Sequence, residues 1–521
     1  MTATIRSLNI QGLDCTPVDI EVDVANGLPQ FIIVGLPDAA VSEARDRVRS
    51  AIKNSGFPFP RTRVTVNLAP AHTRKIGSLF DLPIALGILA ASGVLPQIPQ
   101  EFFVGELALN GTLRPVRGAL PLVDTAMNRL HCSIYIPQAN TPEVSLAVQP
   151  EQRQHIFPVS SLKALVDVFC SEAQLDPLRP IPAAIDQQQP HEHLSHYPVD
   201  MQDIVGQPMA KRALEVAAAG GHNLLMVGAP GVGKSMLAQA LASILPRMTS
   251  TEMIEATTIH SLVEHQGNTI IWQRPFRAPH HTTSPTAIIG GGVHLRPGEI
   301  SLAHHGVLFL DELPEFRRDL LEALRQPLET GSVTIHRIHG KATYPARCMV
   351  VAAMNPCPCG FYGLENRAQG QRSKHKECEC LPYSIEMYKR KISGPLLDRM
   401  DIKMTVSYIN TEDIHQQQST TDAQRERSST IRQRVEAART RQYQRQGQPN
   451  AALSSKQLMN MVSLDQSSQQ LMRQAVEKYR LSMRGYHKTL KVALTIADLA
   501  GQPLQSVHLA EAIRYTAGFE W

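Results

Sequence analysis

The first part of the chain combines two kinds of hydrophobic pattern. Residues 18–24 and 64–67 alternate apolar and polar side chains with the two-residue period of a half-buried strand. Residues 38–55 instead space their apolar side chains three and four positions apart, which predicts an amphipathic helix. Residues 81–92 are nearly all small or apolar and predict a buried helix. Strands and helices mixed in this way predict an α+β domain over residues 1–172.

A change of composition separates this region from the next one. Residues 173–200 contain five prolines and a run of three glutamines, and such a segment buries too little apolar surface to pack, so we expect a linker. From residue 201 to 407, short apolar runs alternate with helical patterns, which predicts an α/β domain with a parallel sheet. Strand patterns then end, and residues 408–521 are expected to be helical. The expected strands of the sheet cover residues 223–227, 307–311, 348–354 and 401–406.

Length and composition restrict the class of protein. The chain has 521 residues, which corresponds to about three domains, and 43% of them are hydrophobic, so it is not intrinsically disordered. The net charge of +5 permits binding to nucleic acid but does not by itself indicate it. The sequence begins without the layout of a signal peptide, and its longest apolar run is shorter than the about 20 residues that span a bilayer. We therefore expect a cytoplasmic protein that does not bind membranes.

A phosphate-binding loop, or P-loop, is the clearest chemical motif. The pattern G-x-x-x-x-G-K-S follows an apolar run and precedes a helical pattern, and in this context the motif binds nucleotide phosphates. Its glycines let backbone N–H groups point at phosphate oxygens, and Lys234 is expected to reach the β- and γ-phosphates of ATP. The alternative is a chance glycine-rich turn. The loop consists of Gly228, Ala229, Pro230, Gly231, Val232, Gly233, Lys234 and Ser235.

Two adjacent carboxylates complete the requirements for hydrolysis of ATP. Asp311 and Glu312 directly follow an apolar run. We expect Asp311 and the Ser235 hydroxyl to hold Mg²⁺, and Glu312 to be the base that orients the attacking water. The alternative is an exposed strand end that happens to carry acidic residues. Together with the P-loop, the pair predicts an ATPase.

These motifs resemble those of AAA+ ATPases. Asp311-Glu312 matches the Walker B pattern, and Asn355 ends the next apolar run at the position of the sensor-1 residue. The segment around Arg399 resembles the one that carries the arginine finger, and the segment around Arg484 resembles the sensor-2 helix. A guanidinium keeps its charge and forks onto phosphate oxygens, which suits both roles. An arginine finger serves the neighbouring subunit, so the resemblance implies a ring, most often a homohexamer.

Each arginine also has a structural interpretation. Arg399 lies beside Asp398 and Asp401 in the sequence and can form an ion pair with either, and Arg484 can lie on a solvated helix face. The resemblance leaves open whether Arg484 acts in its own subunit or in the neighbouring one. It does imply the fold, which is an AAA+ P-loop ATPase core followed by a helical lid over residues 408–521.

Three further segments narrow the resemblance. Residues 274–281, 297–304 and 309–316 together resemble the magnesium-chelatase-like branch of AAA+ ATPases, and within it the ComM/YifB family of bacterial competence proteins. The resemblance extends along essentially the whole chain. It implies a hexameric DNA helicase that drives branch migration during homologous recombination of incoming DNA in natural transformation. It also implies ATP and Mg²⁺ as cofactors, and as partners recombination proteins and single-stranded, double-stranded or branched DNA bound without regard to sequence.

Residues 75–82 and 105–116 carry two motifs of the N-terminal part. Through them this part resembles the ChlI-type domain, whose fold is similar to the Lon protease domain and to the second domain of ribosomal protein S5. A protease of this fold needs a serine nucleophile and an activating lysine. The matching motifs place Leu79 and Leu120 at these two positions, so we expect a domain without protease activity, retained for assembly or for binding DNA. Four basic residues of this part either contact DNA phosphates or are simply solvated: Arg61, Arg63, Arg74 and Lys75.

Four of the eight cysteines form two C-x-C pairs, Cys357 with Cys359 and Cys378 with Cys380. Four thiolates suit tetrahedral Zn²⁺, and the glycine after the first pair leaves room for the tight turn of a zinc knuckle. We therefore predict a structural Zn²⁺ site within an insert that spans residues 357–380. Free reduced thiols and a redox disulfide are the alternatives, and a histidine between the pairs is a possible substitute ligand.

A basic hairpin is expected between the Walker B and sensor-1 segments. Residues 333–344 alternate apolar and polar side chains on both sides of a central turn. Arg337, His339 and Lys341 lie near that turn and are candidates for DNA binding, because phosphate contacts need positive charge and hydrogen-bond donors. Related magnesium-chelatase-like proteins place such a hairpin in the pore of the ring; the alternative is a surface hairpin without contact to DNA. Residues 282–292, which end in glycines, are a second candidate loop.

Two other groups of residues have both a structural and a functional interpretation. The pairs His280-His281 and His304-His305 suggest metal binding, but no carboxylate lies at ligand spacing, so we expect structural hydrogen bonds. Residues 425–445 carry seven arginines in a helical pattern with few acidic residues. This segment is expected to be a solvated helix, and a face that binds DNA or a neighbouring subunit is the alternative.

The sequence therefore predicts an ATP-driven DNA motor, with two alternatives. An ATPase subunit of a magnesium chelatase shares the AAA+ motifs, but the Lon-like region and the cysteine insert argue against it. A protein-remodelling AAA+ chaperone needs an aromatic pore loop that grips polypeptide, and the predicted hairpin offers only Tyr344 near its base.

Overall fold

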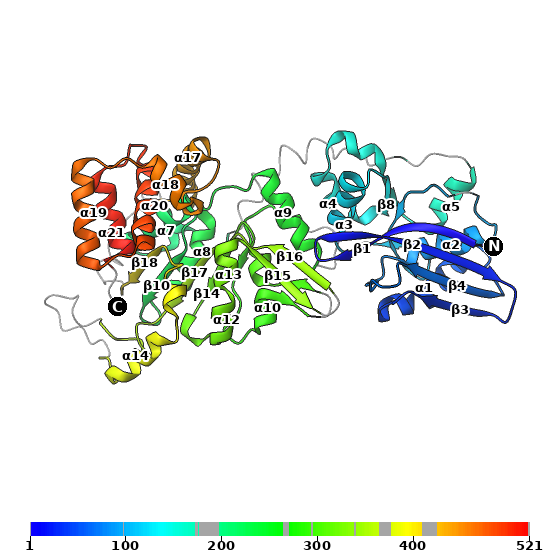
Figure 1. The fold of residues 1–521 in the computed structure, drawn as a ribbon, viewed down its shortest axis with the longest axis horizontal. Coiled ribbons are helices and arrows are strands. Elements are labelled where there is room, and N and C mark those ends of the chain that lie inside the picture. The colour runs from blue at the N-terminus through cyan, green and yellow to red at the C-terminus, as the bar shows by residue number, and fades with distance from the viewer. Residues whose placement is uncertain are drawn as a thin grey trace.

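The structure, a computed structural model, describes most of the chain. Its residues form an elongated molecule with a seven-stranded sheet at one end, a five-stranded sheet in the middle and a group of helices at the other end (Figure 1). No helix among the described residues is long and apolar enough to cross a membrane. The linker expected over residues 173–200 lies almost wholly outside them. The described residues are 2–96, 98–171, 176, 197–263, 270–292, 295–337, 340–363, 377–408 and 425–518.

The seven-stranded sheet has the order β3-β4-β2-β1-β5-β8-β9. β1, β2 and β4 pair antiparallel, and the other neighbours pair parallel. The strands expected at residues 18–24 and 64–67 lie within β2 and β4, which confirms both. The bounds are β1 Thr2–Gln11, β2 Asp14–Ala25, β3 Gln30–Val34, β4 Arg63–Ala69, β5 Phe102–Phe103, β8 Ile134–Pro137 and β9 Ile156–Val159, with a small hairpin of β6 Glu106–Leu107 and β7 Leu113–Arg114.

Helices cover this sheet as the sequence predicts. The expected amphipathic helix is α1, whose first turn is capped by the Asp38 carboxylate accepting from the Val41 N–H. The expected buried helix is α2, and Gly87 lets it approach the sheet because a Cβ there would lie 2.5 Å from Val22 Cγ2. The bounds are α1 Ala39–Asn54, α2 Asp81–Ala91, α3 Ala119–Asp124, α4 Thr141–Ala147 and α5 Leu162–Ser171.

The five-stranded sheet is parallel throughout and has the order β11-β14-β17-β10-β18. All four strands expected from the sequence are present. β10, β14 and β17 are buried along their whole length, as strands of a parallel sheet covered on both faces are. Their carboxyl ends lie side by side, so the motifs that follow them meet at one edge. The bounds are β10 Leu224–Gly228, β11 Phe276–Arg277, β14 Val307–Leu310, β17 Met349–Met354 and β18 Ile402–Val406.

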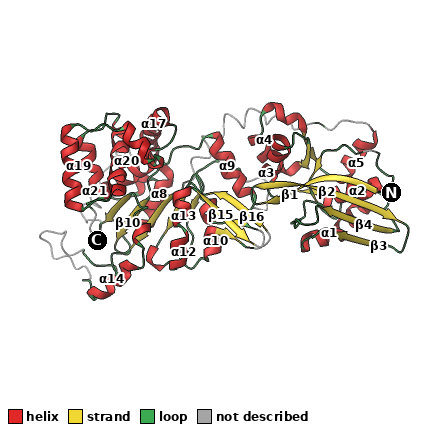
Figure 2. Ribbon diagram, in the orientation of Figure 1, coloured by secondary structure: helices red, strands yellow, loops and turns green. Residues whose placement is uncertain are grey.

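Helices surround the five-stranded sheet, and a C-terminal group packs against α7 and α8 (Figures 1 and 2). Residues 425–518 contain helices and no strand, as expected. The bounds are α7 Pro208–Gly220, α8 Lys234–Ile244, α9 Ser250–Ser261, α10 Pro285–Ile289, α11 Glu299–Leu302, α12 Arg318–Ala323, α13 Arg325–Thr330, α14 Pro382–Arg390, α15 Gly394–Leu397, α17 Ser428–Gln446, α18 Ser455–Met461, α19 Gln466–Tyr479, α20 Met483–Ala500 and α21 Ser506–Thr516.

Two small hairpins are separate from the two large sheets, and the longer one, β15–β16, lies between those sheets in Figure 1. The longer one confirms the hairpin predicted over residues 333–344. The turn between β1 and β2 rests on it, since a Cβ at Gly12 would lie 2.7 Å from Ala342 Cβ. The bounds are β12 Gly290–Gly291, β13 Arg296–Pro297, β15 Ser332–Arg337 and β16 Gly340–Pro345.

Candidate nucleotide-binding site

The P-loop joins β10 to α8. Gly231 and Gly233 have φ angles of +79° and +90°, which side chains rarely adopt. A Cβ at either position would meet no atom within 4 Å, so the backbone conformation, not lack of space, requires glycine. Helix α8 begins at Lys234, so its free N–H groups lie at the end of the loop, where they can bind an anion.

Lys234 connects the P-loop to the end of β17. Its Nζ donates to the carbonyl oxygens of Gly228 and Ala229, at 2.7 and 2.8 Å, and to Asn355 Oδ1 at 3.0 Å. Burial lowers the pKa of Lys234, and the nearby carboxylates of Asp311 and Glu312 oppose this shift. The structure thus brings together the P-loop lysine and the residue that resembles sensor 1.

Ser235 and Asp311, the two residues expected to hold Mg²⁺, are in direct contact. Ser235 Oγ donates to Asp311 Oδ2 at 2.7 Å, and the other carboxylate oxygen of Asp311 accepts from the Glu312 N–H at 2.9 Å. A hydroxyl and a carboxylate oxygen are ligands that Mg²⁺ prefers. Glu312 itself has a φ of +52°, so the chain turns sharply directly after β14.

Glu312 has a partner, His281, that the sequence does not indicate. His281 Nδ1 lies 3.3 Å from Glu312 Oε2, and the His281 ring lies against that of His280, tilted by 34° at a centroid distance of 4.1 Å. Because β11 and β14 are neighbours in the sheet, the residues that follow them meet. The order of strands, which the sequence does not state, was the missing signal.

Arg399 and Arg484 converge on one carboxylate. Arg399 forms an ion pair with Glu329, and Arg484 Nη2 lies 3.7 Å from the same Glu329 Oε1. The ion pair predicted as the alternative for Arg399, with Asp398 or Asp401, is therefore wrong: Glu329, on α13, lies in its place. Burial lowers the pKa of Arg399, and the positive charge of Arg484 adds to this shift. Among the described residues, neither guanidinium bonds to the P-loop of its own chain.

The surroundings of His304 and His305 differ from the expectation that no carboxylate lies near them. A carboxylate does lie within ligand reach, because Glu255 Oε2, on α9, is 3.1 Å from His304 Nε2 and 2.6 Å from His305 Nε2. However, His304 Nδ1 accepts from the Arg347 N–H at 3.0 Å, so the neutral ring carries its proton on Nε2 and donates it to Glu255. The expected structural hydrogen bonds are thus confirmed, although the stated absence of a carboxylate was wrong.

The arginine-rich helix is not simply solvated. On α17, Arg439 donates to the Ala218 and Ala219 carbonyls at 2.8 and 3.0 Å, at the end of α7. Arg432 Nε donates to the Ser243 carbonyl at 2.9 Å, at the end of α8. These guanidiniums satisfy carbonyl groups that helix ends leave free. Side chains of the same helix also bond to Glu215, Asp498 and Asn450: Arg434, Arg441 and Arg445.

In the N-terminal region, leucines stand at the two positions where a protease of this fold needs its serine and its lysine. Leu79 and Leu120 are both buried in the core. Ser78, the neighbouring serine, donates its hydroxyl hydrogen bond to Glu106. Lys75 is also buried and donates to the Pro70 carbonyl, so the prediction that it contacts solvent or phosphate is wrong.

The hairpin β15–β16 has one buried and one exposed face. Val333, Ile335, Ala342 and Tyr344 are buried on one face, and Lys341 lies on the exposed face opposite His336. Arg337 is exposed at the end of β15, next to the turn. His339 lies outside the described residues. The second candidate loop, residues 282–292, forms α10 and β12, and β12 lies beside this hairpin: a Cβ at Gly291 would lie 3.4 Å from Arg337 Nη2. Arg296, on β13, is exposed nearby.

The four cysteines meet in space. The Sγ atoms of Cys357 and Cys359 are 3.3 Å apart, and Cys378 Sγ lies 3.7 and 3.6 Å from them. Cys380 completes the group, in which all four sulfurs lie within 4.8 Å of one another. None of the four forms a disulfide in this structure, so the alternative of a redox disulfide is not observed. The basic side chains between the two pairs lie outside the described residues.

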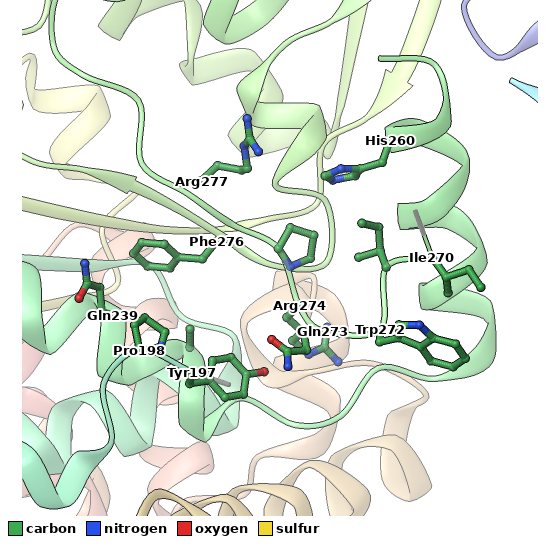
Figure 3. Close-up of a pocket in the computed structure, with 13 residues that line it drawn as sticks. Tyr197, Pro198, Gln239, His260, Ile270, Trp272, Gln273, Arg274, Phe276 and Arg277 are labelled. Carbon is green, nitrogen blue, oxygen red and sulfur yellow. The ribbon is translucent and has the colours of Figure 1, made fainter. Parts of the chain in front are cut away.

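A cleft of about 550 Å³ lies at the β11 edge of the five-stranded sheet, and neither the P-loop nor the Asp311-Glu312 pair lines it (Figure 3). Both guanidiniums in its lining are paired with carboxylates, Arg274 with Glu252 at 2.9 Å and Arg277 with Glu299 at 2.6 Å. No P-loop residue lines it. Its lining includes Tyr197, Gln239, His260, Trp272 and Phe276. The cleft is therefore not the site of the nucleotide phosphates.

Three protein-family models match successive parts of the chain. The model described as "Magnesium chelatase, subunit ChlI" matches residues 200–414, which contain the five-stranded sheet and the P-loop. "Subunit ChlI of Mg-chelatase" matches residues 20–140, and "Magnesium chelatase, subunit ChlI C-terminal" matches residues 425–516.

Comparison with individual proteins gives full-length relatives. Competence protein ComM of Haemophilus influenzae is 44% identical over 520 residues, which cover 99% of this chain and 97% of that protein. YifB of Salmonella typhimurium is 41% identical over 519 residues, again 99% of this chain and 97% of that protein. An archaeal Lon protease of Thermococcus kodakarensis is 22% identical over 140 residues, 27% of this chain and 22% of that protein. The chain belongs to the ComM/YifB family of magnesium-chelatase-like AAA+ ATPases.

Proposed function

We propose that this protein is an ATP-dependent DNA motor that works as a homohexamer and drives branch migration of incoming DNA during natural transformation. Family membership supports hydrolysis of ATP, and the name of the Haemophilus influenzae relative supports a part in competence. The observation that carries the DNA part of the proposal is the exposed basic end of the hairpin β15–β16, where Arg337 and Lys341 flank the turn.

The P-loop residues fit ATP and Mg²⁺. The Lys234 ammonium group now donates to three oxygen atoms of the chain. In the proposed complex it donates to the β- and γ-phosphates of ATP instead. Ser235 and Asp311 already share a hydrogen bond of 2.7 Å and would hold the metal ion. When bound, Mg²⁺ neutralises charge on the phosphate oxygens. The rest of the loop, Gly228 to Gly233, supplies backbone N–H groups.

The remaining polar residues have two proposed roles: to orient the attacking water and to sense the γ-phosphate. Glu312 is proposed as the base that orients the attacking water, with His281 holding its carboxylate. Asn355, hydrogen-bonded to Lys234, lies at the same edge of the sheet and is proposed as the sensor of the γ-phosphate. Arg399 and Arg484 are proposed to act on the nucleotide of the neighbouring subunit, since neither bonds to the P-loop of its own chain.

The exposed end of the hairpin fits the DNA backbone better than a polypeptide. Arg337 and Lys341 are exposed there on either side of the turn, and Arg296 adds a third charge on the adjacent small hairpin. Such a group of positive charges binds phosphates without reading bases. His339 is proposed as part of the same surface. Tyr344, the aromatic residue that a chaperone-like pore would need, is buried and donates its hydroxyl to the Leu295 carbonyl.

A structural Zn²⁺ ion is proposed at the four cysteines. Sulfur atoms at the corners of a tetrahedron, each about 2.3 Å from zinc, are about 3.8 Å apart. The observed Sγ distances of 3.3 to 3.7 Å approach this value. Backbone N–H groups of Gly360 and Tyr362 point at Cys357 Sγ, at 3.2 and 3.4 Å, which stabilises a thiolate. The donor set therefore fits the metal.

The parts of the chain have proposed roles. Residues 201–407 are the ATPase core, and residues 408–521 are a lid over the nucleotide. Residues 1–172 form a Lon-like domain without protease activity, joined to the core by the linker at residues 173–200. This division and the roles of its parts are proposals for deletion experiments.

The test is the rate of ATP hydrolysis without DNA and with single-stranded, duplex and branched DNA, alongside a strand-exchange assay. DNA should raise the rate, and the double variant Arg337→Ala/Lys341→Ala should lose this stimulation, whereas Arg473→Ala, on the exposed surface of α19, should keep it. Glu312→Gln should bind ATP and DNA but hydrolyse orders of magnitude more slowly. A hydrolysis rate that does not respond to any DNA would overturn the proposal.

A further inference from the structure

The cysteine cluster lies directly against the P-loop. β17 ends at Met354, Asn355 bonds to Lys234, and Cys357 follows two positions later. The chain then turns back toward β10. The cluster therefore begins two residues after the one that contacts the P-loop lysine, and its turn at Gly360 contacts the loop itself.

The contact is made by Gly360 and Pro230. Gly360 has a φ of +89°, and a Cβ there would lie 2.5 Å from Pro230 Cδ and 2.8 Å from Pro230 Cγ. The backbone of the knuckle thus packs on the proline ring without room for a single methyl group. Pro230 is the third residue of the P-loop, directly before Gly231, whose φ of +79° shapes the phosphate cradle.

The position of Gly360 depends on the sulfur atoms. Its N–H lies 3.0 Å from the Cys357 carbonyl oxygen and 3.2 Å from Cys357 Sγ, and Cys357 is fully buried. The Tyr362 N–H also points at this sulfur, at 3.4 Å. A metal ion that fixes the sulfur therefore fixes the turn that presses on the P-loop.

The second pair of cysteines connects the cluster to the segment that carries Arg399. Cys380 directly precedes Leu381, the N-cap residue of α14, and α14 leads through α15 to Arg399. Cys359 and Cys378 are 19 positions apart in the sequence, and holding two such distant residues together costs conformational entropy. A tetrathiolate site offsets that cost.

We infer that the metal occupancy of this cluster sets the affinity of the P-loop for ATP. A Zn²⁺ ion held by Cys357, Cys359, Cys378 and Cys380 braces Gly360 against Pro230 and keeps the loop in the conformation that binds phosphates. Loss of the ion lets Gly360 move away from Pro230, and the P-loop then binds ATP more weakly. The inference rests on the nucleotide and zinc sites proposed above.

The test measures zinc content and the Kd for a fluorescent ATP analogue on the full-length protein. Removing zinc with a chelator should raise the Kd by about tenfold, a change of about 1.4 kcal/mol, and adding Zn²⁺ back should restore it. Gly360→Ala should keep one zinc per chain and still raise the Kd. Gly363→Ala is the matched control, because Gly363 also has a positive φ, +75°, but a Cβ there meets no atom within 4 Å.

The outcomes separate the three proposals. A zinc-free protein that binds ATP as tightly as the zinc-loaded one overturns the coupling, as does Gly360→Ala with full zinc and unchanged affinity. Purified protein with less than half an equivalent of zinc per chain overturns the zinc site, and so the inference. A zinc-loaded protein that does not bind ATP overturns the proposed function instead. If Gly360→Ala does not fold, chelation and zinc addition on the native chain still decide the matter.

Discussion

Lys234, Arg399 and Arg484 are the three cations proposed to bind phosphate oxygens. In this structure, each of them contacts oxygen atoms of its own chain instead. Lys234 bonds to backbone carbonyls and to Asn355, and Arg399 and Arg484 share Glu329. In the proposed mechanism, each cation would exchange one acceptor for another when nucleotide binds, and none would be held unpaired in a partly buried place. On the same proposal, the carboxylate of Glu329 would compete with phosphate for both arginines.

This competition predicts the effect of Glu329→Gln. The substitution removes the negative charge but keeps the size of the side chain, so Arg399 and Arg484 lose their common counter-ion. Glu329 is half exposed, and an exposed ion pair is worth about 0 to 1 kcal/mol, so the KM for ATP of the assembled ring should fall by up to about fivefold. Steady-state ATPase assays measure it. Glu386→Gln, which removes an exposed ion pair with Arg390, is the control; an unchanged or higher KM for Glu329→Gln would contradict the competition.

Whole helices are joined by guanidinium groups. Arg439, Arg432 and Arg441 of α17 donate to carbonyl groups at the ends of α7, α8 and α20. Carbonyls at helix ends have no partner within their own helix and carry the negative end of the helix dipole, so an arginine there supplies both a donor and a charge. Desolvation lowers the pKa of Arg439 to about 10, and the group keeps its charge at neutral pH. The C-terminal helices are thus attached to the core through polar contacts as well as apolar ones.

Removal of one of these contacts should destabilise the protein. Arg439→Ala leaves the Ala218 and Ala219 carbonyls without their donor, and an unsatisfied buried acceptor costs about 1–3 kcal/mol. We expect a loss of about 2–4 kcal/mol in the free energy of unfolding, measured by calorimetry and chemical denaturation. Arg473→Ala, which removes only an exposed pair with Glu477, should cost less than about 0.5 kcal/mol. Equal effects of the two substitutions would show that the helix-end contacts contribute little.

At the scale of the whole molecule, the N-terminal sheet contacts the proposed DNA-binding hairpin. The turn between β1 and β2 packs on β16 at Gly12, and a second contact joins the Gly118 N–H to the Ser261 carbonyl at 3.1 Å, at the end of α9. Leu13 packs on the apolar cluster that contains Ala342 and Tyr344. Any movement of the hairpin during ATP hydrolysis therefore acts on the N-terminal sheet as well.

Gly12→Val tests this contact. The new side chain has no room, since a Cβ at Gly12 would lie 2.7 Å from Ala342 Cβ and 3.1 Å from the Tyr344 hydroxyl oxygen. The two parts of the molecule should separate, which limited proteolysis would detect as faster cleavage of the linker region, and DNA should stimulate ATP hydrolysis less. Gly56→Val is the matched control: its φ of +90° is similarly strained for valine, but a Cβ there meets no atom within 4 Å. Identical behaviour of the two variants would mean that backbone strain, not the contact, is responsible.

Local patterns were sufficient to predict several of the elements, although not strands such as β1, β3 or the edge strand β11. The alternation in β2 and β4, the amphipathic spacing in α1 and the apolar runs of β10, β14, β17 and β18 all predicted the observed structure, because each depends on residues close together in the chain. The same holds for the P-loop, where the glycines, Lys234 and Ser235 are contiguous. A contiguous motif specifies its own local geometry.

The partners of the site residues were decided by the tertiary structure. Glu329 beside Arg399, His281 beside Glu312, Glu255 beside the histidine pair and Pro230 beneath Gly360 all come from separate elements. The sequence names the chemical groups, but which of them meet depends on strand order and on the packing of helices. Ion pairs and close contacts act only over a few ångströms, so the path of the whole chain in space determines them.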